Sequence, residues 1–367
     1  MDSKGYRIYQ EENKMRIPNG ERTTIAHPLR EGLQGQETET PEKQPKCTKA
    51  IQLVTQATDC HQNQQYNAAI KFLQQALTIY REIESRSDEG VVLGKIGNAF
   101  YALGDYVKAI NYYLQWLDVA RELKDLRAEG LALGNLGNAY RHLEDNVRAI
   151  EYQQQSLAIA KAVGDDRGEV AALNNLGLAF KALGNYEKTV EYLQQSLLLM
   201  QKLQDRQGEA QVLRNLGNVF YALGNYAQAI DAYQKRLAIA KDIQDGRGEL
   251  QVLRNLASAC YAVGDYSKAI EYYQMRLEIA RKIEEHRVEE QTLGNLGVTY
   301  EAVGNFAKAV ECYEQRLAVA IFMQDSRVEQ QSLGSLKVAC YAMGDYARAF
   351  KYQEMRNNPS QNFIGNR

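Results

Sequence analysis

The sequence predicts an all-α protein, a solenoid of about eight antiparallel helix hairpins. The first observation behind this prediction is that leucine returns eight times at intervals of forty residues. It stands at Leu53, Leu93, Leu133, Leu173, Leu213, Leu253, Leu293 and Leu333. The second is that no proline lies between Cys47 and Asn358, which suits helices because proline breaks their interiors. Such a period indicates an array in which each unit buries its apolar face against the next.

The prolines and the composition divide the chain into three parts. Residues 1–46 hold four of the five prolines and show no apolar period, so we expect a disordered or loosely ordered arm. Residues 47–356 carry the repeats and are expected to form one solenoid of eight forty-residue units. Residues 357–367 are expected to be a frayed tail.

One unit, residues 209–248, shows how each hairpin is specified. Leu213, Leu216 and Phe220 recur at helical spacing and predict the buried face of a first helix. Gly224 predicts its end, because glycine adopts the left-handed C′ conformation without a Cβ penalty. A second helix follows, with an apolar face that is made by Tyr226, Ala229, Ile230, Tyr233 and Leu237. Gly217 and Ala229 are small, which lets the two helices approach closely.

The links between units carry a capping signal. The pattern Asp-x-Arg-x-Glu occurs at 125–129, 245–249 and 325–329. It predicts an N-cap acceptor and a first-turn carboxylate at the start of the next helix, where the helix dipole favours both.

These residues resemble a known family. The pattern L-x-x-L-G-x-x-Y/F, then G-x-Y, then A-x-x-x-Y, is similar to the tetratricopeptide repeat (TPR), and the match covers about residues 49–356. The resemblance implies a right-handed superhelix whose first helices line a concave groove. The usual first-helix Trp is Leu here and the closing Pro is absent. The forty-residue unit resembles the longer repeats of spindle-orientation adaptors and kinesin light chains.

Two units break the pattern. Glu144 occupies the glycine position of its hairpin, where a left-handed backbone would cost ~1 kcal/mol or more, so we expect a soft point near 141–147. Lys337 occupies the close-packed glycine position of the last unit, and its ammonium is expected to extend toward solvent.

Charge and motifs exclude several classes of function. The net charge of -2 gives no basic field for nucleic acid, and no apolar run is long enough to span a membrane. The four histidines show no metal-ligand spacing, and no CxxC or phosphate-binding loop occurs. We therefore expect no enzyme, no metal and no cofactor. Cys60, Cys260 and Cys340 share a repeat position and are expected to be buried reduced thiols, which favours a cytoplasmic protein.

A polar row beside the apolar face of the first helices is the candidate peptide-binding site. Its members recur every forty residues: Asn135, Asn138, Asn175, Gln211, Arg214, Asn215, Asn218, Tyr221, Gln251, Arg254, Asn255, Tyr261 and Asn295. An amide carries both donors and an acceptor, so it can hold the backbone of an extended peptide, while an arginine can pair with a carboxylate of that peptide. The alternatives are plain solvation and bonding between repeats, because one face of any amphipathic helix is polar.

A second row lies on the second helices and changes along the chain. It reads Ala76, Trp116, Ser156, Ser196, Arg236, Arg276, Arg316 and Arg356. The four arginines suggest either salt bridges to nearby Glu or a strip that binds an acidic partner. Trp116, the sole tryptophan, is either packed between repeats or an anchor for a partner.

These observations favour a protein-interaction scaffold that binds an extended or short helical segment of a protein or peptide partner in its groove. One alternative is a sensor of a short signal peptide, similar to bacterial pheromone receptors, although residues 1–46 look too short and polar for the effector bundle of those receptors. Others are an accessory subunit of an enzyme complex and self-association through the C-terminal edge, Phe350 to Phe363.

Overall fold

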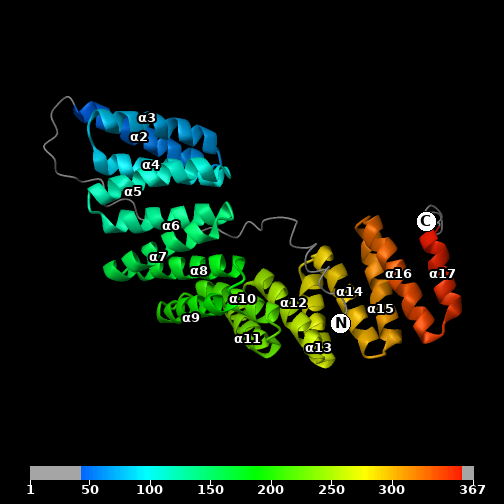
Figure 1. Ribbon diagram of the computed structural model, residues 1–367. Coiled ribbons are helices and arrows are strands. Elements are labelled where there is room, and N and C mark those ends of the chain that lie inside the picture. The colour runs from blue at the N-terminus through cyan, green and yellow to red at the C-terminus, as the bar shows by residue number, and fades with distance from the viewer. Residues whose placement is uncertain (1–42, 358–367) are drawn as a thin grey trace. The chain divides into compact units, whose positions relative to one another are not determined.

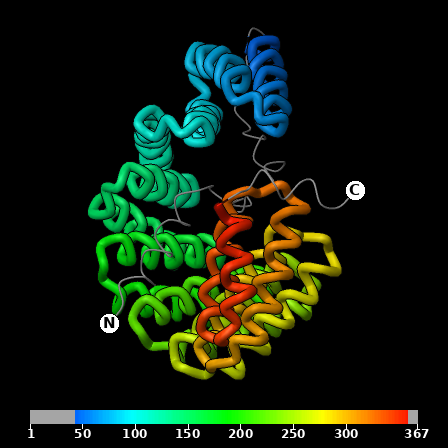
Figure 2. The backbone as a smooth tube through the Cα atoms, turned by 90° about the vertical axis from the view of Figure 1, so that its right-hand side faces the viewer, coloured from blue at the N-terminus to red at the C-terminus, as the bar shows by residue number. Residues whose placement is uncertain are grey.

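The computed structural model describes residues 43–357, and this range contains sixteen helices and no strand (Figure 1). The helices are α2 (Lys43–Gln62), α3 (Tyr66–Glu82), α4 (Arg86–Ala102), α5 (Tyr106–Glu122), α6 (Leu126–His142), α7 (Asn146–Val163), α8 (Asp166–Ala182), α9 (Tyr186–Lys202), α10 (Arg206–Ala222), α11 (Tyr226–Asp242), α12 (Gly246–Val263), α13 (Tyr266–Lys282), α14 (His286–Ala302), α15 (Phe306–Phe322), α16 (Ser326–Met343) and α17 (Tyr346–Asn357). From α3 to α17, each helix packs against the next one along the chain (Figure 2). Even-numbered helices open the hairpins and odd-numbered helices close them, so the prediction of an all-α hairpin solenoid is confirmed.

The ordered array begins slightly earlier than residue 47. Helix α2 starts at Lys43 and takes Pro45 into its first turn, where the missing N–H of proline has no helical partner to lose. Residues 49–357 lie within one compact unit. The arm expected before residue 43 and the tail expected after residue 357 lie outside the described residues. No helix among residues 43–357 is both long and apolar enough to cross a bilayer.

The turns within hairpins follow the predicted chemistry. Gly224 adopts a left-handed backbone with φ +75°, which ends α10. The predicted caps also form, since the carboxylates of Asp125, Asp245 and Asp325 each accept a backbone N–H three residues later, at 3.0, 2.9 and 3.1 Å. The helix boundaries are therefore encoded locally.

The links between hairpins use a conformation that the sequence pattern did not reveal. Their left-handed residues are mostly not glycine: Glu84, Lys124, Gln204, Gln244, Glu284 and Gln324. Glu144, within a hairpin, likewise keeps a left-handed backbone with φ +61°. The array thus accepts this strain at many corners, and the soft point expected at 141–147 stays a prediction.

The core is a repeated contact between the two helices of a hairpin. Leu213 and Leu216 are buried in α10, and a Cβ added at Gly217 would lie 2.3 Å from the Tyr233 ring of α11. Glycine therefore lets the Tyr233 ring lie directly against the backbone of α10, and a side chain here would displace that ring. At the equivalent place in α16, Lys337 is half-buried and its ammonium reaches over the Tyr341 ring at 5.9 Å.

The cysteine position behaves mainly as an apolar site. Cys260 and Cys340 are buried, whereas Cys60 is half-buried. Burial raises the pKa of the Cys260 thiol to about 11, so it stays protonated at neutral pH.

Candidate peptide-binding face

The polar sides of α4, α6, α8, α10, α12 and α14 form a continuous surface, which we call the A-face. In α10 it consists of Gln211, Arg214, Asn215, Asn218 and Tyr221, which are exposed or half-buried and lie opposite the buried leucines. The first helices α4 and α6 touch directly, because Asn135 of α6 donates its amide to the oxygen of Asn98 in α4 at 3.3 Å. Helices α6 and α8 also pack against each other, so the predicted row crosses these three hairpins.

Charged groups on the A-face are crowded by protein. Lys181 is exposed to solvent, yet burial lowers its pKa, and the nearby Arg214 lowers it further. Burial likewise lowers the pKa of Lys95 and raises that of Glu301. Desolvation disfavours the charged form of each group.

Several predicted asparagines are engaged within the array. The oxygen of Asn218 accepts the Tyr233 hydroxyl at 2.7 Å, and the oxygen of Asn138 accepts the Gln153 amide at 3.2 Å. Both bonds join the first helix of a hairpin to its second helix. These two amides keep only their donors for an external ligand.

Four other predicted asparagines are differently placed. They occupy one repeat position, are half-buried, and make no side-chain hydrogen bond among residues 43–357: Asn175, Asn215, Asn255 and Asn295. Asn135 shares this position but donates to Asn98. A row of four amides at one repeat position thus retains both donors and acceptors.

The remaining predicted residues border this row. Gln211 is exposed, and Gln251 is exposed but accepts a hydrogen bond from Arg236 at 2.8 Å. Tyr221 and Tyr261 are half-buried and meet the next tyrosine along their hairpins edge-on, with ring centroids 5.3 and 5.2 Å apart. The tyrosines are therefore partly held by aromatic packing.

Four arginines lie at two depths near the middle of the A-face. Arg214 and Arg254 are half-buried on first helices, while Arg236 and Arg276 on second helices are buried. Burial, followed by repulsion from Arg214, lowers the pKa of Arg236 to about 10. Arg236 and Arg276 are therefore buried between helices and do not form an exposed row along the second helices.

Two other members of that second row, Arg316 and Trp116, contact neighbouring side chains or backbone. Arg316 makes an ion pair with Glu290 at 3.1 Å, which matches the salt-bridge interpretation. Trp116 packs over Gly94, where an added Cβ would lie 3.0 Å from its ring, so the tryptophan serves packing within its hairpin.

Sequence reasoning missed two cations on the A-face. Arg141 and Lys181 take the place that Tyr101, Tyr221 and Tyr261 fill in other units. The signal was a change of residue type at one repeat position, which becomes visible when units are aligned by their forty-residue period.

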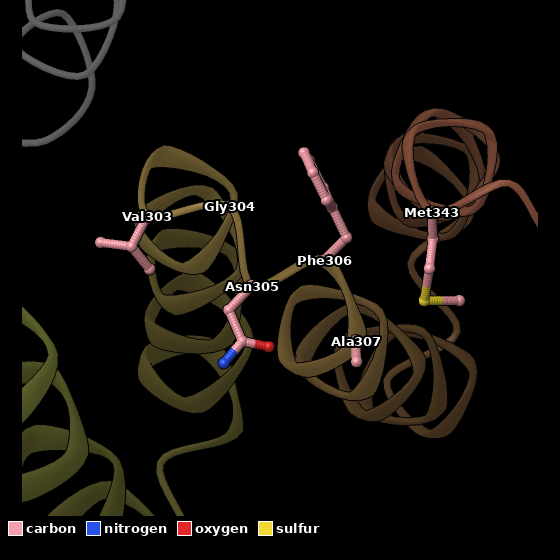
Figure 3. Close-up of a pocket in the computed structure, with 6 residues that line it drawn as sticks. All are labelled: Val303, Gly304, Asn305, Phe306, Ala307 and Met343. Carbon is pink, nitrogen blue, oxygen red and sulfur yellow. The ribbon is translucent and has the colours of Figure 1, made fainter.

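The described residues also form a surface pocket away from the A-face. It is lined by Val303, Gly304, Asn305, Phe306 and Ala307 at the turn between α14 and α15, and by Met343 at the end of α16 (Figure 3). None of these side chains is ionisable, so the lining supplies no general acid or base.

Solved structures with the same fold are numerous but distant. A signal-transduction ATPase with a tetratricopeptide repeat sensor from Pyrococcus horikoshii is 18% identical, with a TM-score of 0.61, over 88% of this chain and 46% of that chain. This chain thus spans about half the length of that ATPase. Aspartyl phosphate phosphatase F from Bacillus subtilis is 15% identical, with a TM-score of 0.56, over 76% of this chain and 72% of that chain.

A third structure aligns over nearly the full length of both chains. The quorum sensor NprR from B. thuringiensis is 14% identical, with a TM-score of 0.50, over 96% of this chain and 91% of that chain. At these identities the likeness shows the fold alone. Among curated proteins, none matches this sequence.

Family models decide the relationship. One model described as tetratricopeptide repeat matches residues 50–122, 128–197, 168–242 and 248–321, and a second with the same description matches residues 214–281. The matched residues make up most of the chain, so this protein belongs to the tetratricopeptide repeat family.

Proposed function

We propose that this protein is a non-catalytic interaction scaffold, whose A-face lines a groove that binds an extended or short helical segment of a partner protein. The observation that carries the proposal is the row formed by Asn175, Asn215, Asn255 and Asn295, which are half-buried and make no side-chain hydrogen bond among residues 43–357. Because these amides are only partly covered, their donors and acceptors remain accessible from solvent and are available to a ligand. A guest backbone would satisfy them.

The chemistry of the row suits a peptide. Each asparagine amide offers two donors and an acceptor, and peptide units of a guest offer the complementary groups. Because the amides sit on rigid helices, little ordering of the scaffold is needed, and the entropic cost falls mainly on the guest. Affinity then comes from the backbone, and selectivity comes from the neighbouring arginines and tyrosines.

The buried thiols also suit a reducing compartment, so we propose that binding takes place in the cytoplasm.

The test is a pair of double variants in the intact chain. Partners captured from the source lysate supply the binding segment, and calorimetry with that segment measures affinity. We expect Asn215→Ala with Asn255→Ala to abolish detectable binding, and Arg214→Glu with Arg254→Glu to do the same, while circular dichroism stays unchanged.

The matched control is Asn111→Ala, which removes an exposed asparagine from α5, outside the A-face. This variant should bind like the unaltered protein. Full binding by both double variants would remove the A-face as the site.

A second candidate is a sensor of a short signal peptide. The observation that favours it is the NprR structure, described as a quorum sensor, whose repeat fold aligns with nearly the whole of this chain. Calorimetry with peptides of five to ten residues distinguishes the two candidates. Tight binding of so short a ligand supports the sensor, whereas a requirement for longer segments supports the scaffold.

A further inference from the structure

Three arginines at one repeat position have three different sets of partners. Arg316 donates from Nε to the buried carboxylate of Glu290 at 3.1 Å and from Nη2 to Gln331 at 3.2 Å. Arg276 donates from Nε to the Leu250 carbonyl at 3.1 Å and from Nη1 to the Thr292 hydroxyl at 2.5 Å. In these two units, acceptors from the same hairpin or the next one take up the N–H groups of the guanidinium.

Arg236 lacks an equivalent set. Its Nη2 donates to Gln251 at 2.8 Å, but its Nη1 is buried and has no hydrogen-bond partner. Only 7% of Arg236 is exposed. The carboxylate of Asp245 attracts it from a distance, but one oxygen of that carboxylate caps α12 through the Gly248 N–H. A buried charge with an open donor is costly unless another group supplies the missing partner.

The missing partner can be identified by aligning the units. Glu290, which pairs with Arg316, corresponds to Ala210 in the unit of Arg236. Gly294, which lies against Arg316, corresponds to Arg214. One unit thus supplies its own carboxylate, while the other replaces that carboxylate with alanine and adds a second cation.

The guanidinium of Arg236 is hydrogen-bonded to a side chain of the A-face. Its partner Gln251 is exposed on that face. A carboxylate that took the place of the Gln251 amide could accept from Nη1 and Nη2 together, in the bidentate geometry that arginine favours. Arg214 is close enough to Lys181 and to Arg236 to shift the pKa of each, and this local positive charge would attract such a group.

We propose that the A-face between α10 and α12 binds a Glu or Asp side chain of the guest segment, and that Arg236 is the residue that selects it. The assignment rests on the proposed peptide-binding function and names the chemistry of the guest. An acidic residue of the guest would pair with Arg236, as Glu290 of this chain pairs with Arg316.

The experiment presents a displayed library of random twelve-residue peptides to the intact chain. The unaltered protein should select peptides that share an acidic residue at one position. Replacing that residue by its amide in a synthetic peptide should weaken binding at least tenfold by calorimetry.

The decisive variant is Ala210→Glu, which supplies Arg236 with an internal carboxylate. This variant should lose the acidic preference, and the acidic and amide forms of the peptide should then bind alike. Ala210→Gln is the neutral control and should keep the preference. If Ala210→Glu fails to fold, Arg236→Met tests the same point, because it removes the cation and should also abolish the preference.

The outcomes separate the two proposals. Selected peptides without a shared acidic residue, or an acidic preference unchanged in Ala210→Glu and Arg236→Met, would overturn the role of Arg236 but leave the scaffold function standing. A library that yields no binding peptide would likewise overturn the role of Arg236, whereas the scaffold function is decided separately by the double variants at Asn215 and Asn255 and at Arg214 and Arg254.

Discussion

The hairpins α10–α11 and α14–α15 share an apolar frame, by which we mean the buried leucines and the contact between tyrosine and glycine. They differ in the polar layer, which is the set of polar side chains around the arginine of the second helix. Each buries its leucines and packs a tyrosine ring against glycine, at Gly217 in one and Gly297 in the other. In α14–α15 the half-buried Arg316 meets the buried carboxylate of Glu290, whereas in α10–α11 the buried Arg236 keeps an open donor. The frame therefore defines the fold, and the polar layer is free to vary from one unit to another.

The largest expected effect tests the shared frame. Leu216→Ala and Leu296→Ala each truncate a buried leucine and should lower the free energy of unfolding by about 2–5 kcal/mol. Denaturant unfolding of both variants provides the measurement. A cost in one hairpin and none in the other would show that the frames are not equivalent.

A somewhat smaller effect tests the polar layers. Glu290→Ala should destabilise the protein by about 3 kcal/mol, because it strands the half-buried Arg316 without its anion. Ala210→Glu should not destabilise to this extent, since it gives Arg236 a partner. If the stability of Glu290→Ala equals that of the unaltered protein, the internal pair has no role in folding.

An N-terminal hairpin extends the comparison to pH. Burial by itself raises the pKa of Glu89, but hydrogen bonds from Arg81 and Arg86 outweigh it, so the pKa is lowered overall. A lowered carboxylate pKa stabilises the fold at pH values above the ordinary 4.5, and this contribution is lost as the pH falls through the folded value.

Glu89→Gln should remove this contribution. The difference in unfolding free energy between the unaltered protein and the variant should therefore be largest near neutral pH and shrink below pH 4.5. A difference that is constant across this range would show that the two arginines do not act through the charge of Glu89.

The smallest effect concerns the turns. Glu144→Gly should raise the free energy of unfolding by about 1 kcal/mol or less, because glycine relieves the left-handed strain but loses more chain entropy. Thermal unfolding measures the gain. Amide exchange at 141–147 that is no faster than in the neighbouring turns would rule out the expected soft point.

The frame was predictable because its determinants are local and repeated. The leucine period, the Gly224 turn and the aspartate caps each act within a few residues. For the candidate site, the sequence predicted the row of polar residues but not which of them remain available for binding. Whether an asparagine is available depends on the residue fifteen positions later, since Tyr233 engages Asn218.

The burial of Arg236 was not predictable from the same pattern. Its repeat position holds Ala76 and Trp116 elsewhere, so residue type alone does not reveal that the position faces neighbouring first helices. The left-handed Gln244 and Lys124 were also missed, because the sequence rule for such corners looks for glycine.

The Arg236–Gln251 bond has a mechanical consequence. It joins α11 of one hairpin to α12 of the next, so it is a tie across a joint of the array. A ligand that takes over the arginine releases this tie and replaces it with one that it holds itself. Occupancy of the site by such a ligand would therefore exchange one of the contacts that hold α11 against α12.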